Sequence, residues 1–273
     1  WTKNSQSITR LLLPFNTRNT TTLKDYSGFN NQGSVTGATW ITNGVVGGAY
    51  SFSGLDSFDY VSIPHSSSLD GGGTWDALTI EHWIALSDNQ TGSRIISKMS
   101  SSSEAKRSYE IGVSGSLPAN RLYAAVVIGS NIYKEVVYNT PLVPSCWYHV
   151  VLTYKSGVGV KLYLNGTLVA TNTNETTGNI QASPGKILCI GAYNGSGSYL
   201  AGNVDEVKIY PFALSPQQIT QNYQQERYGQ SSSATMVDEE TNPTEQWSCA
   251  ITPSNSYFDG LTKTSNTVTI HDQ

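Results

Sequence analysis

The sequence predicts an all-β protein, built as a two-sheet antiparallel sandwich with one short helix near its C-terminal end. Segments rich in β-branched and aromatic residues recur along the chain, and clusters of Ser, Gly, Pro and Asn separate them about every eight to twelve residues. Charged residues make up only 13% of the chain, which disfavours helix-rich classes. A chain of 273 residues is long enough for one large sandwich and a smaller unit.

The clearest segment runs from Cys146 to Thr171. It begins with the β-branched and aromatic run Trp147–Tyr154, and a Gly-rich turn leads to a second strand at Val160–Leu164. Asn165-Gly166 is the dipeptide that most readily adopts the two positive φ angles of a type I′ turn, after which the chain returns as a third strand. The pattern predicts a three-stranded meander.

The other strands and the helix follow from the same reasoning. Ser215 is expected to cap the helix, with Pro216 in its first turn, Gln218 completing a capping box and Gly229 ending it. Period-two patterns predict strands at Ser7–Phe15, Ala38–Ile41, Ala49–Phe52, Tyr60–Ile63, Leu78–Leu86, Arg94–Lys98, Tyr109–Val113, Arg121–Ile128, Ile132–Tyr138, Lys186–Ala192 and Asn203–Tyr210. A polar segment begins near residue 230, and Gln246–Ile251 and Asn266–Ile270 are expected to be strands beyond it.

The charge and the apolar pattern of the chain limit its partners. A net charge of −4 gives no basic stripe, so neither nucleic acid nor an anionic membrane is an expected partner. No run of about 18 apolar residues occurs and the chain opens without a hydrophobic signal core, so we expect a processed chain with no direct membrane insertion. Sequons predict a glycosylated, extracellular or cell-surface chain; they begin at Asn19, Asn89, Asn165, Asn174 and Asn194.

Cysteine and histidine patterns do not indicate a metal or catalytic site. Cys146, Cys189 and Cys249 lie far apart in the sequence. Cys146 and Cys189 flank predicted neighbouring strands, which leaves open one disulfide or plain buried thiols. His82 and His149 lack zinc-binding spacing and are expected to be packed, hydrogen-bonded residues within strands.

The carboxylates do not suggest glycoside hydrolysis. No Glu-x-Asp-x-Glu run occurs, Glu135 stands alone in its strand, and Asp205 and Glu206 are expected on opposite faces of theirs. The sequence therefore predicts no catalytic residue and no enzyme. Two carboxyl groups on facing strands within about 6 Å of one another, in a cleft, would reopen that alternative.

The order of the segments along the chain resembles a known family. The segments LLLPF, LKDYSGFNNQGSVTGATW, GVVGGAYSFSG, LTIEHWI, CWYHVVLTY, KLYLNGTLVA and GNVDEVKIYPFALSPQQI follow one another over residues 8–228. This array resembles the laminin-G-like domains of the concanavalin A-like lectin/glucanase superfamily. The resemblance implies a jelly roll closed by a short Ser-Pro-capped helix, similar to domains inserted in very large repetitive surface proteins of archaea and bacteria.

The ends of the chain look like the flanks of such insertions. The resemblance implies a small, incomplete immunoglobulin-like unit of a large archaeal-type surface protein, interrupted by the jelly roll. The chain then divides into a strand of that unit at 1–10, the jelly roll at 11–229 and immunoglobulin-like strands at 230–273. About 43 residues are too few for an independent sandwich, so another repeat or subunit is expected to complete it, with Trp1, Trp247 and Cys249 at the joint.

One turn is rich in oxygen ligands. Asp25 and Asn31 lie in it, and relatives often bind a structural calcium in the matching loop near an Asp of the last strand, here Asp205. The resemblance therefore implies Ca²⁺ at Asp25, Asn31 and Asp205, and no other cofactor. The alternative is an Asx-turn at Asp25 and a backbone cap by Asp205.

These observations favour a non-enzymatic structural or adhesive module, a repeat or subunit of an extracellular array or filament. Its partners would be neighbouring copies, joined by strand exchange at the termini. A calcium-dependent, lectin-like domain that binds surface glycans is the first alternative, and a glycosidase or polysaccharide lyase is the second. Glycan binding needs exposed aromatic rings beside polar groups, and the candidates are Tyr123, Tyr133, Tyr138, Tyr193 and Tyr199.

Overall fold

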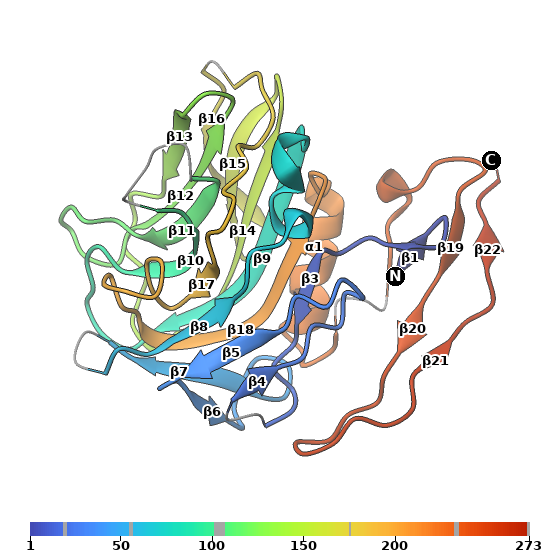
Figure 1. Cartoon of the computed structure of the whole chain (residues 1–273), viewed down its shortest axis with the longest axis horizontal. Coiled ribbons are helices and arrows are strands. Elements are labelled where there is room, and N and C mark those ends of the chain that lie inside the picture. The colour runs from blue at the N-terminus through green and yellow to red at the C-terminus, as the bar shows by residue number, and fades with distance from the viewer. Residues whose placement is uncertain (19–20, 55–56, 101–106, 175, 232–234, 272–273) are drawn as a thin grey trace.

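The protein is a two-sheet sandwich with a smaller β-unit at its side (Figure 1). The computed structural model describes residues 1–18, 21–54, 57–100, 107–174, 176–231 and 235–271. Two antiparallel sheets stack over one hydrophobic core, and strands from both ends of the chain form the smaller unit. The predicted all-β jelly-roll sandwich with a short helix is confirmed.

One sheet, called the site sheet below, has eight strands. In spatial order they are β13 (Ile132–Val137), β12 (Leu122–Ile128), β11 (Tyr109–Val113), β10 (Arg94–Lys98), β17 (Leu188–Ile190), β8 (Tyr60–Ile63), β5 (Gly33–Thr36) and β4 (Thr22–Leu23). Of these strands, β4 and β5 lie where the sequence predicts no strand. The other boundaries lie close to the predicted ones where a strand was predicted.

The other sheet, called the helix sheet, carries the helix α1 (Pro216–Glu226) on its outer face. Its path is β16 (Thr167–Asn172), β15 (Gly159–Leu164), β14 (Tyr148–Lys155), β9 (Ala77–Leu86), β18 (Ala201–Tyr210), β7 (Ala49–Ser53) and β6 (Thr39–Ile41), and β3 (Leu11–Leu13) pairs with the end of β18. The type I′ prediction between β15 and β16 is confirmed, since φ is +51° at Asn165 and +78° at Gly166.

Alternation along each strand decides which side chains enter the core. In β11, Tyr109, Ile111 and Val113 are fully buried in the main cluster between the sheets. Glu110 and Gly112 therefore project from the outer face of the site sheet. The same rule sends Leu122, Ala124 and Val126 of β12 inward and Tyr123 and Ala125 outward.

The helix begins as predicted but its capping box is only half formed. The Ser215 hydroxyl accepts a hydrogen bond from the Gln218 N–H at 3.1 Å, which confirms Ser215 as the N-cap. The Gln218 side chain does not return to Ser215; it donates to Asn222 Oδ1 at 2.7 Å and accepts from the Val237 N–H at 2.8 Å. Burial against residues 235–237 draws this side chain away from the helix start. Short 3-10 turns lie at η1 (Ser67–Leu69), η2 (Gly71–Gly73) and η5 (Asp238–Glu240).

Both ends of the chain meet in the terminal β-unit. Its sheet has the order β2 (Gln6–Ser7), β1 (Thr2–Lys3), β19 (Gln246–Ser248) and β22 (Val268–Thr269), and β20 (Ala250–Ile251) pairs with β21 (Lys263–Thr264). Trp1 and Trp247 lie edge to face with ring centroids 6.3 Å apart, in a second apolar cluster that includes Ile219 of α1. The immunoglobulin-like character of this unit stays a prediction.

The hairpin beyond β20 reaches back to the sandwich (Figure 1). Near its tip, Asp259 accepts hydrogen bonds from Lys24 Nζ at 2.6 Å and from the Tyr26 hydroxyl at 2.8 Å. The Arg18 N–H also donates to the Ser256 carbonyl at 2.8 Å. The β20–β21 hairpin is thus anchored at its base by the tryptophan pair and at its tip by Asp259.

Candidate functional site

A row of outward side chains crosses one end of the site sheet. Ser97 pairs with Glu110, Glu110 with Ala125, and Ala125 with Glu135, so these residues share one face of β10, β11, β12 and β13. The next row contains Arg94, Gly112 and Tyr123. Register therefore brings an arginine, two glutamates and a tyrosine together from separate strands.

Tyr133 joins the two glutamates. Its hydroxyl lies 3.2 Å from Glu110 Oε1 and 3.1 Å from Glu135 Oε2, so the two carboxylate oxygens are no more than about 6 Å apart. A phenol has one proton to donate, so it satisfies one carboxylate at a time. The other carboxylate keeps a free acceptor at the same spot.

Arg94 lies on the other side of Glu110. Its Nε donates to Glu110 Oε2 at 2.9 Å, and its guanidinium carbon lies 5.2 Å from the ring centroid of Tyr123 and 5.6 Å from that of Tyr193. Burial lowers the pKa of Arg94, but the Glu110 carboxylate more than offsets this and holds it above the usual value. Nη1 donates to the Gly92 carbonyl at 3.0 Å, while Nη2 has no hydrogen-bond partner among the described residues.

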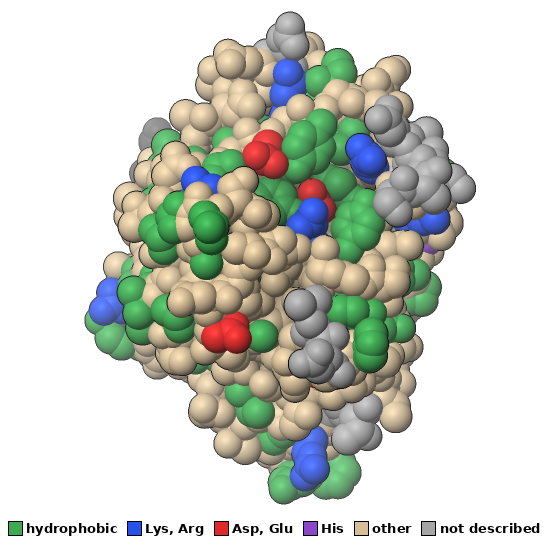
Figure 2. Space-filling model, turned by 90° about the vertical axis from the view of Figure 1, so that its left-hand side faces the viewer, with side chains coloured by type: hydrophobic (Ala, Val, Ile, Leu, Met, Phe, Trp, Pro, Cys, Tyr) green, Lys and Arg blue, Asp and Glu red, His purple; other side chains and the backbone are tan. Residues whose placement is uncertain are grey.

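Two buried hydroxyls of this face, those of Ser97 and Ser108, also lack partners within the described chain. Burial, followed by the Glu110 charge, raises the pKa of Tyr123 and of Tyr133, so both hydroxyls remain protonated donors. Native proteins rarely leave buried polar groups without a partner, so these hydroxyls are groups that a ligand or water can satisfy. Figure 2 shows this face, where acidic and basic side chains meet hydrophobic ones in a shallow hollow.

Gly112 makes room for the Tyr123 ring. A Cβ at this position would lie 2.5 Å from the Ser93 carbonyl and 2.9 Å from Tyr123 Cε1. Any larger residue would displace the ring from Arg94. A glycine inside a strand often marks such a close approach, so Gly112 is a sequence signal that the prediction did not use.

Of the tyrosines named from the sequence, the structure brings Tyr123, Tyr133 and Tyr193 together. Tyr133 is 40% exposed and offers its ring to solvent, whereas Tyr123 is buried beneath Arg94. Tyr138 instead packs against the main core, and Tyr199 lies edge to face with Phe58 at 5.3 Å. Sequence reasoning missed the partners of the three tyrosines, Arg94 and Glu110.

The residues predicted to bind calcium are engaged with protein donors. Asp25 is buried, and its carboxylate accepts from the N–H groups of Leu12, Ser27 and Asn31 at 3.0, 2.8 and 2.9 Å and from the Ser27 hydroxyl at 2.7 Å. Asn31 Nδ2 donates to the Arg10 carbonyl at 2.7 Å. These bonds match the Asx-turn alternative.

Asp205 has a similar environment on another strand. Its Oδ2 accepts from the Val45 and Val46 N–H groups at 2.8 and 3.1 Å, and its Oδ1 accepts from the Glu206 N–H at 2.8 Å. Burial raises the pKa of Asp205 to about 7 despite these donors. The calcium set of Asp25, Asn31 and Asp205 stays a prediction.

The predicted sequons differ in access. Asn19 lies outside the described residues. Asn89 and Asn174 are exposed, Asn194 is half-buried, and the half-buried Asn165 uses its Oδ1 to accept from the His149 N–H at 2.9 Å. All three cysteines are free, with Cys189 buried and Cys146 exposed, so no disulfide joins β14 to β17.

A second cluster of charges lies between the helix sheet and α1. Glu81, His149 and Glu226 have ligand-type atoms within 4.8 Å of one another, and all are fully buried. Each of these atoms already has a hydrogen-bond partner. Glu81 Oε1 lies 2.8 Å from His149 Nε2 and accepts from Asn222 Nδ2 at 3.0 Å. Glu226 Oε2 accepts from Trp83 Nε1 at 2.6 Å. The cluster is a hydrogen-bonded network that fixes the helix, and it does not fit a metal ion.

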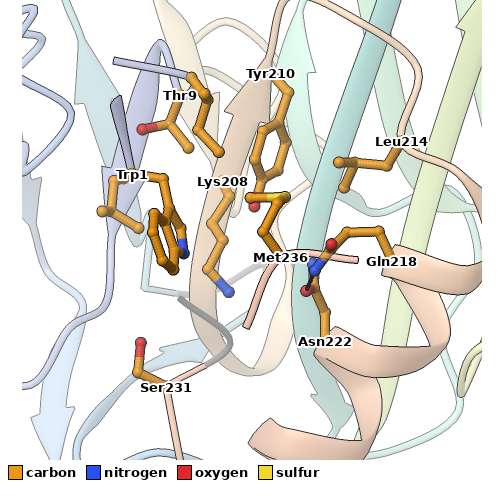
Figure 3. Close-up of a pocket in the computed structure, with 11 residues that line it drawn as sticks. Trp1, Thr9, Lys208, Tyr210, Leu214, Gln218, Asn222, Ser231 and Met236 are labelled. Carbon is orange, nitrogen blue, oxygen red and sulfur yellow. Dashed lines mark hydrogen bonds between the residues drawn. The ribbon is translucent and has the colours of Figure 1, made fainter. Parts of the chain in front are cut away.

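Lys208 completes this network and borders a small cavity. Its ammonium pairs with Glu226 and lies 3.2 Å from Glu206 Oε2. The cavity of about 40 Å³ lies between Lys208, α1 and Trp1, as Figure 3 shows, and is large enough for a water molecule. Burial raises the pKa of Glu81, but Lys208 and His149 outweigh it and lower that pKa to about 2.

The prediction that Asp205 and Glu206 lie on opposite faces is wrong. The pairing register of β18 with β9 shifts between Asp205 and Lys208, and Glu206 has φ of +50°. This bulge inserts an extra residue, so Glu206 reaches Lys208 on the outer face, the side that Asp205 shares with its partner Trp83. His82 also differs from expectation: it points into the apolar core, and neither ring nitrogen has a partner among the described residues.

A laminin G family model, described as the concanavalin A-like lectin/glucanases superfamily, matches residues 55–220. The chain belongs to this superfamily. No curated protein sequence matches it. Within the described residues, no helix is long and apolar enough to cross a membrane.

Solved structures share the fold at low identity. The binding domain of botulinum neurotoxin serotype G aligns with a TM-score of 0.61 and 16% identity over 79% of this chain and 50% of that one. The binding domain of Paraclostridial Mosquitocidal Protein 1 gives 0.59 and 16%, over 79% and 51%. This chain therefore spans about half the length of each of these two proteins.

A third similar structure is matched over nearly its whole length. It is domain 4 of AbnA, a GH43 extracellular arabinanase from Geobacillus stearothermophilus, in complex with arabinotriose. It aligns with a TM-score of 0.59 and 18% identity over 79% of this chain and 98% of that one. At such identities the likeness shows the shared fold alone.

Proposed function

We propose that the sandwich is an extracellular glycan-binding module whose ligand lies over Tyr133 and Arg94 on the outer face of the site sheet. One observation carries this proposal: the Tyr133 hydroxyl lies between the carboxylates of Glu110 and Glu135, beside an arginine with a free Nη2. The arrangement offers an acceptor and a donor next to an exposed ring.

That combination suits a sugar better than other small ligands. The half-exposed rings of Tyr133 and Tyr193 offer apolar faces for the C–H side of a pyranose or furanose, while its hydroxyls both donate and accept. Glu135 is exposed and accepts, and Arg94 donates. The arabinotriose complex of the arabinanase domain and the binding domains among the similar structures support a binding role for this fold.

A glycan array that includes neutral, acidic and amino sugars tests the proposal. We expect binding by the wild type, retained at a reduced level in Tyr133→Phe, which keeps the ring, and lost in Tyr133→Ala. Tyr228→Ala is the matched control, because Tyr228 is 70% exposed and lies beyond α1, away from the site. Absence of binding by the wild type across the array, with and without calcium, would reject the proposal.

The carboxylate pair makes hydrolysis a rival activity. A separation of no more than about 6 Å is compatible with the spacing of retaining glycosidases, which is about 5 Å. In this protein, however, the Tyr133 hydroxyl lies between the two groups and Arg94 holds Glu110. We therefore expect no release of p-nitrophenol from chromogenic glycosides. Turnover that Glu135→Gln abolishes would replace the binding module by an enzyme.

The terminal β-unit supports a second candidate function, assembly with neighbouring copies or repeats of a cell-surface array. Its β2 and β22 are edge strands. The terminal β-unit also exposes several large hydrophobic side chains: Ile251, Tyr257, Phe258, Leu261 and Val268. Such edges accept a further strand through main-chain hydrogen bonds. Light scattering at protein concentrations from about 1 to about 100 µM tests this assembly, because weak contacts have dissociation constants of that order. A strict monomer over that range contradicts it.

A further inference from the structure

A polar cleft lies beside the candidate site, where the edges of the two sheets meet. Its volume is about 310 Å³, which falls within the range of about 300–1,000 Å³ for small-molecule sites. Its walls are the last strand of each sheet, β13 and β16. The cleft therefore opens at the edge that the glycan site adjoins.

Glu135 belongs to both places. Its carboxylate stands on the outer face of the site sheet, where it contacts the Tyr133 hydroxyl at 3.1 Å. Its backbone carbonyl lies in the plane of the sheet and accepts from Asn172 Nδ2 across the cleft at 2.9 Å. Because β13 is the outermost strand, a molecule that extends from Tyr133 past Glu135 enters the cleft without crossing another strand.

The lining of the cleft matches hydroxyl groups. Thr171, Thr173 and Asn174 contribute exposed hydroxyl and amide groups, and Asn172 is fixed because its Oδ1 accepts from the Asn174 N–H at 3.0 Å. Among the lining residues Glu135 is the only charged one. No cation in this lining would pair with an acidic sugar.

The charges of the neighbouring site point the same way. Arg94 is already paired with Glu110, and Arg107, a further cation of this face, acts on Tyr193. Among the described residues, Glu135 makes no ion pair. A uronic or sialic acid would place a second anion close to it. An uncharged sugar meets only hydrogen-bonding groups and rings.

We propose that the cleft is a second subsite, and that the ligand is an uncharged oligosaccharide with one unit over Tyr133 and the next between β13 and β16. This inference rests on the proposed glycan-binding function. It assigns the subsite to Thr171, Asn172, Thr173 and Glu135. It also requires affinity to increase with chain length, because a single sugar reaches only one subsite.

Titration calorimetry with arabino-, xylo- and cello-oligosaccharides, each from the monosaccharide to the pentasaccharide, tests the inference, with oligogalacturonides as acidic probes. Thr173→Trp fills the cleft; Thr177→Trp, exposed on the same loop but outside the lining, is the matched control. We expect the wild type and the control to bind the longer chains of one neutral series about tenfold more tightly than its monosaccharide. In Thr173→Trp this gain should disappear while monosaccharide binding is unchanged.

The outcomes separate the two proposals. If Tyr133→Ala abolishes binding but Thr173→Trp keeps the gain with length, the cleft is not a subsite and the glycan-binding function stands. If oligogalacturonides bind as tightly as the neutral chains, the uncharged class is wrong. If no series binds to the wild type, both the function and the inference fail.

Discussion

Replacing Lys208 by Met would test whether the buried network holds α1 on the helix sheet. The Lys208 side chain is only 3% exposed, and its ammonium pairs with Glu226 and Glu206. Met keeps the apolar stem and removes the charge. The carboxylates of Glu81, Glu206 and Glu226 would then share a buried space without the positive charge of Lys208.

The expected loss is large. Removing one partner of a buried ion pair costs about 3–5 kcal/mol, because the other charge stays desolvated without compensation. A natural domain has about 5–15 kcal/mol of unfolding free energy. Lys208→Met should therefore remove a substantial fraction of the stability without changing the fold of the site sheet.

Urea unfolding at pH 7, followed by tryptophan fluorescence, measures this loss. Lys155→Met is the control, since Lys155 is exposed at the end of β14 and should change the free energy by about 0.5 kcal/mol or less. Adding Glu226→Gln to Lys208→Met should recover part of the loss, because one uncompensated charge is removed. A loss below about 1 kcal/mol, or no recovery in the double variant, would refute the reasoning.

Three further predictions concern other parts of the chain. Burial, followed by the nearby His149, lowers the pKa of His82 to about 3, so as pH falls below about 6.5 the unfolded chain takes up this proton before the folded protein does. His82→Leu should therefore raise the free energy of unfolding by about 1–2 kcal/mol at pH 7 and by more at pH 5.5. Urea unfolding measures both values, and an equal gain at the two pH values would contradict this. Asp259→Ala should increase amide hydrogen exchange in residues 253–263, 17–18 and 21–26, with β1 and β19 as the internal reference that stays unchanged. The calcium prediction requires millimolar calcium to raise the Tm and Asp25→Asn to abolish that rise; a constant Tm in the wild type contradicts it.

The strands were predictable because their signal is local. The predicted strands Tyr109–Val113 and Arg94–Lys98 match β11 and β10 residue for residue, and Asn165-Gly166 is the turn that its sequence predicts. Each of these features depends on neighbours a few residues away. Packing against distant parts of the chain did not change these local preferences.

The candidate site was less predictable, because it depends on register between distant strands. Glu110 and Glu135 are 25 positions apart, and only the pairing of both with Ala125 places them in one row. The sequence named Tyr133 and took Glu135 for an isolated carboxylate, and it did not name Glu110. The bulge at Glu206 was also hidden, because a glutamate with positive φ carries no local signal and is held there by Lys208 and the surrounding strands.

The two outer faces of the sandwich use their charges in opposite ways. On the helix sheet, α1 covers Glu81, His149 and Lys208, and the ligand-type atoms of the cluster are bonded to one another or to Trp83, Tyr210 and Asn222. On the site sheet no helix covers Arg94 and Glu110, one tyrosine proton serves two carboxylates, and buried hydroxyls lack partners within the described chain. In the helix-sheet network His149 Nδ1 and Glu206 Oε1 also lack partners among the described residues, but this network is buried, whereas Tyr133 and Glu135 of the site sheet are exposed. This difference in exposure is the reason that the proposed glycan site is placed on the face that carries Tyr133.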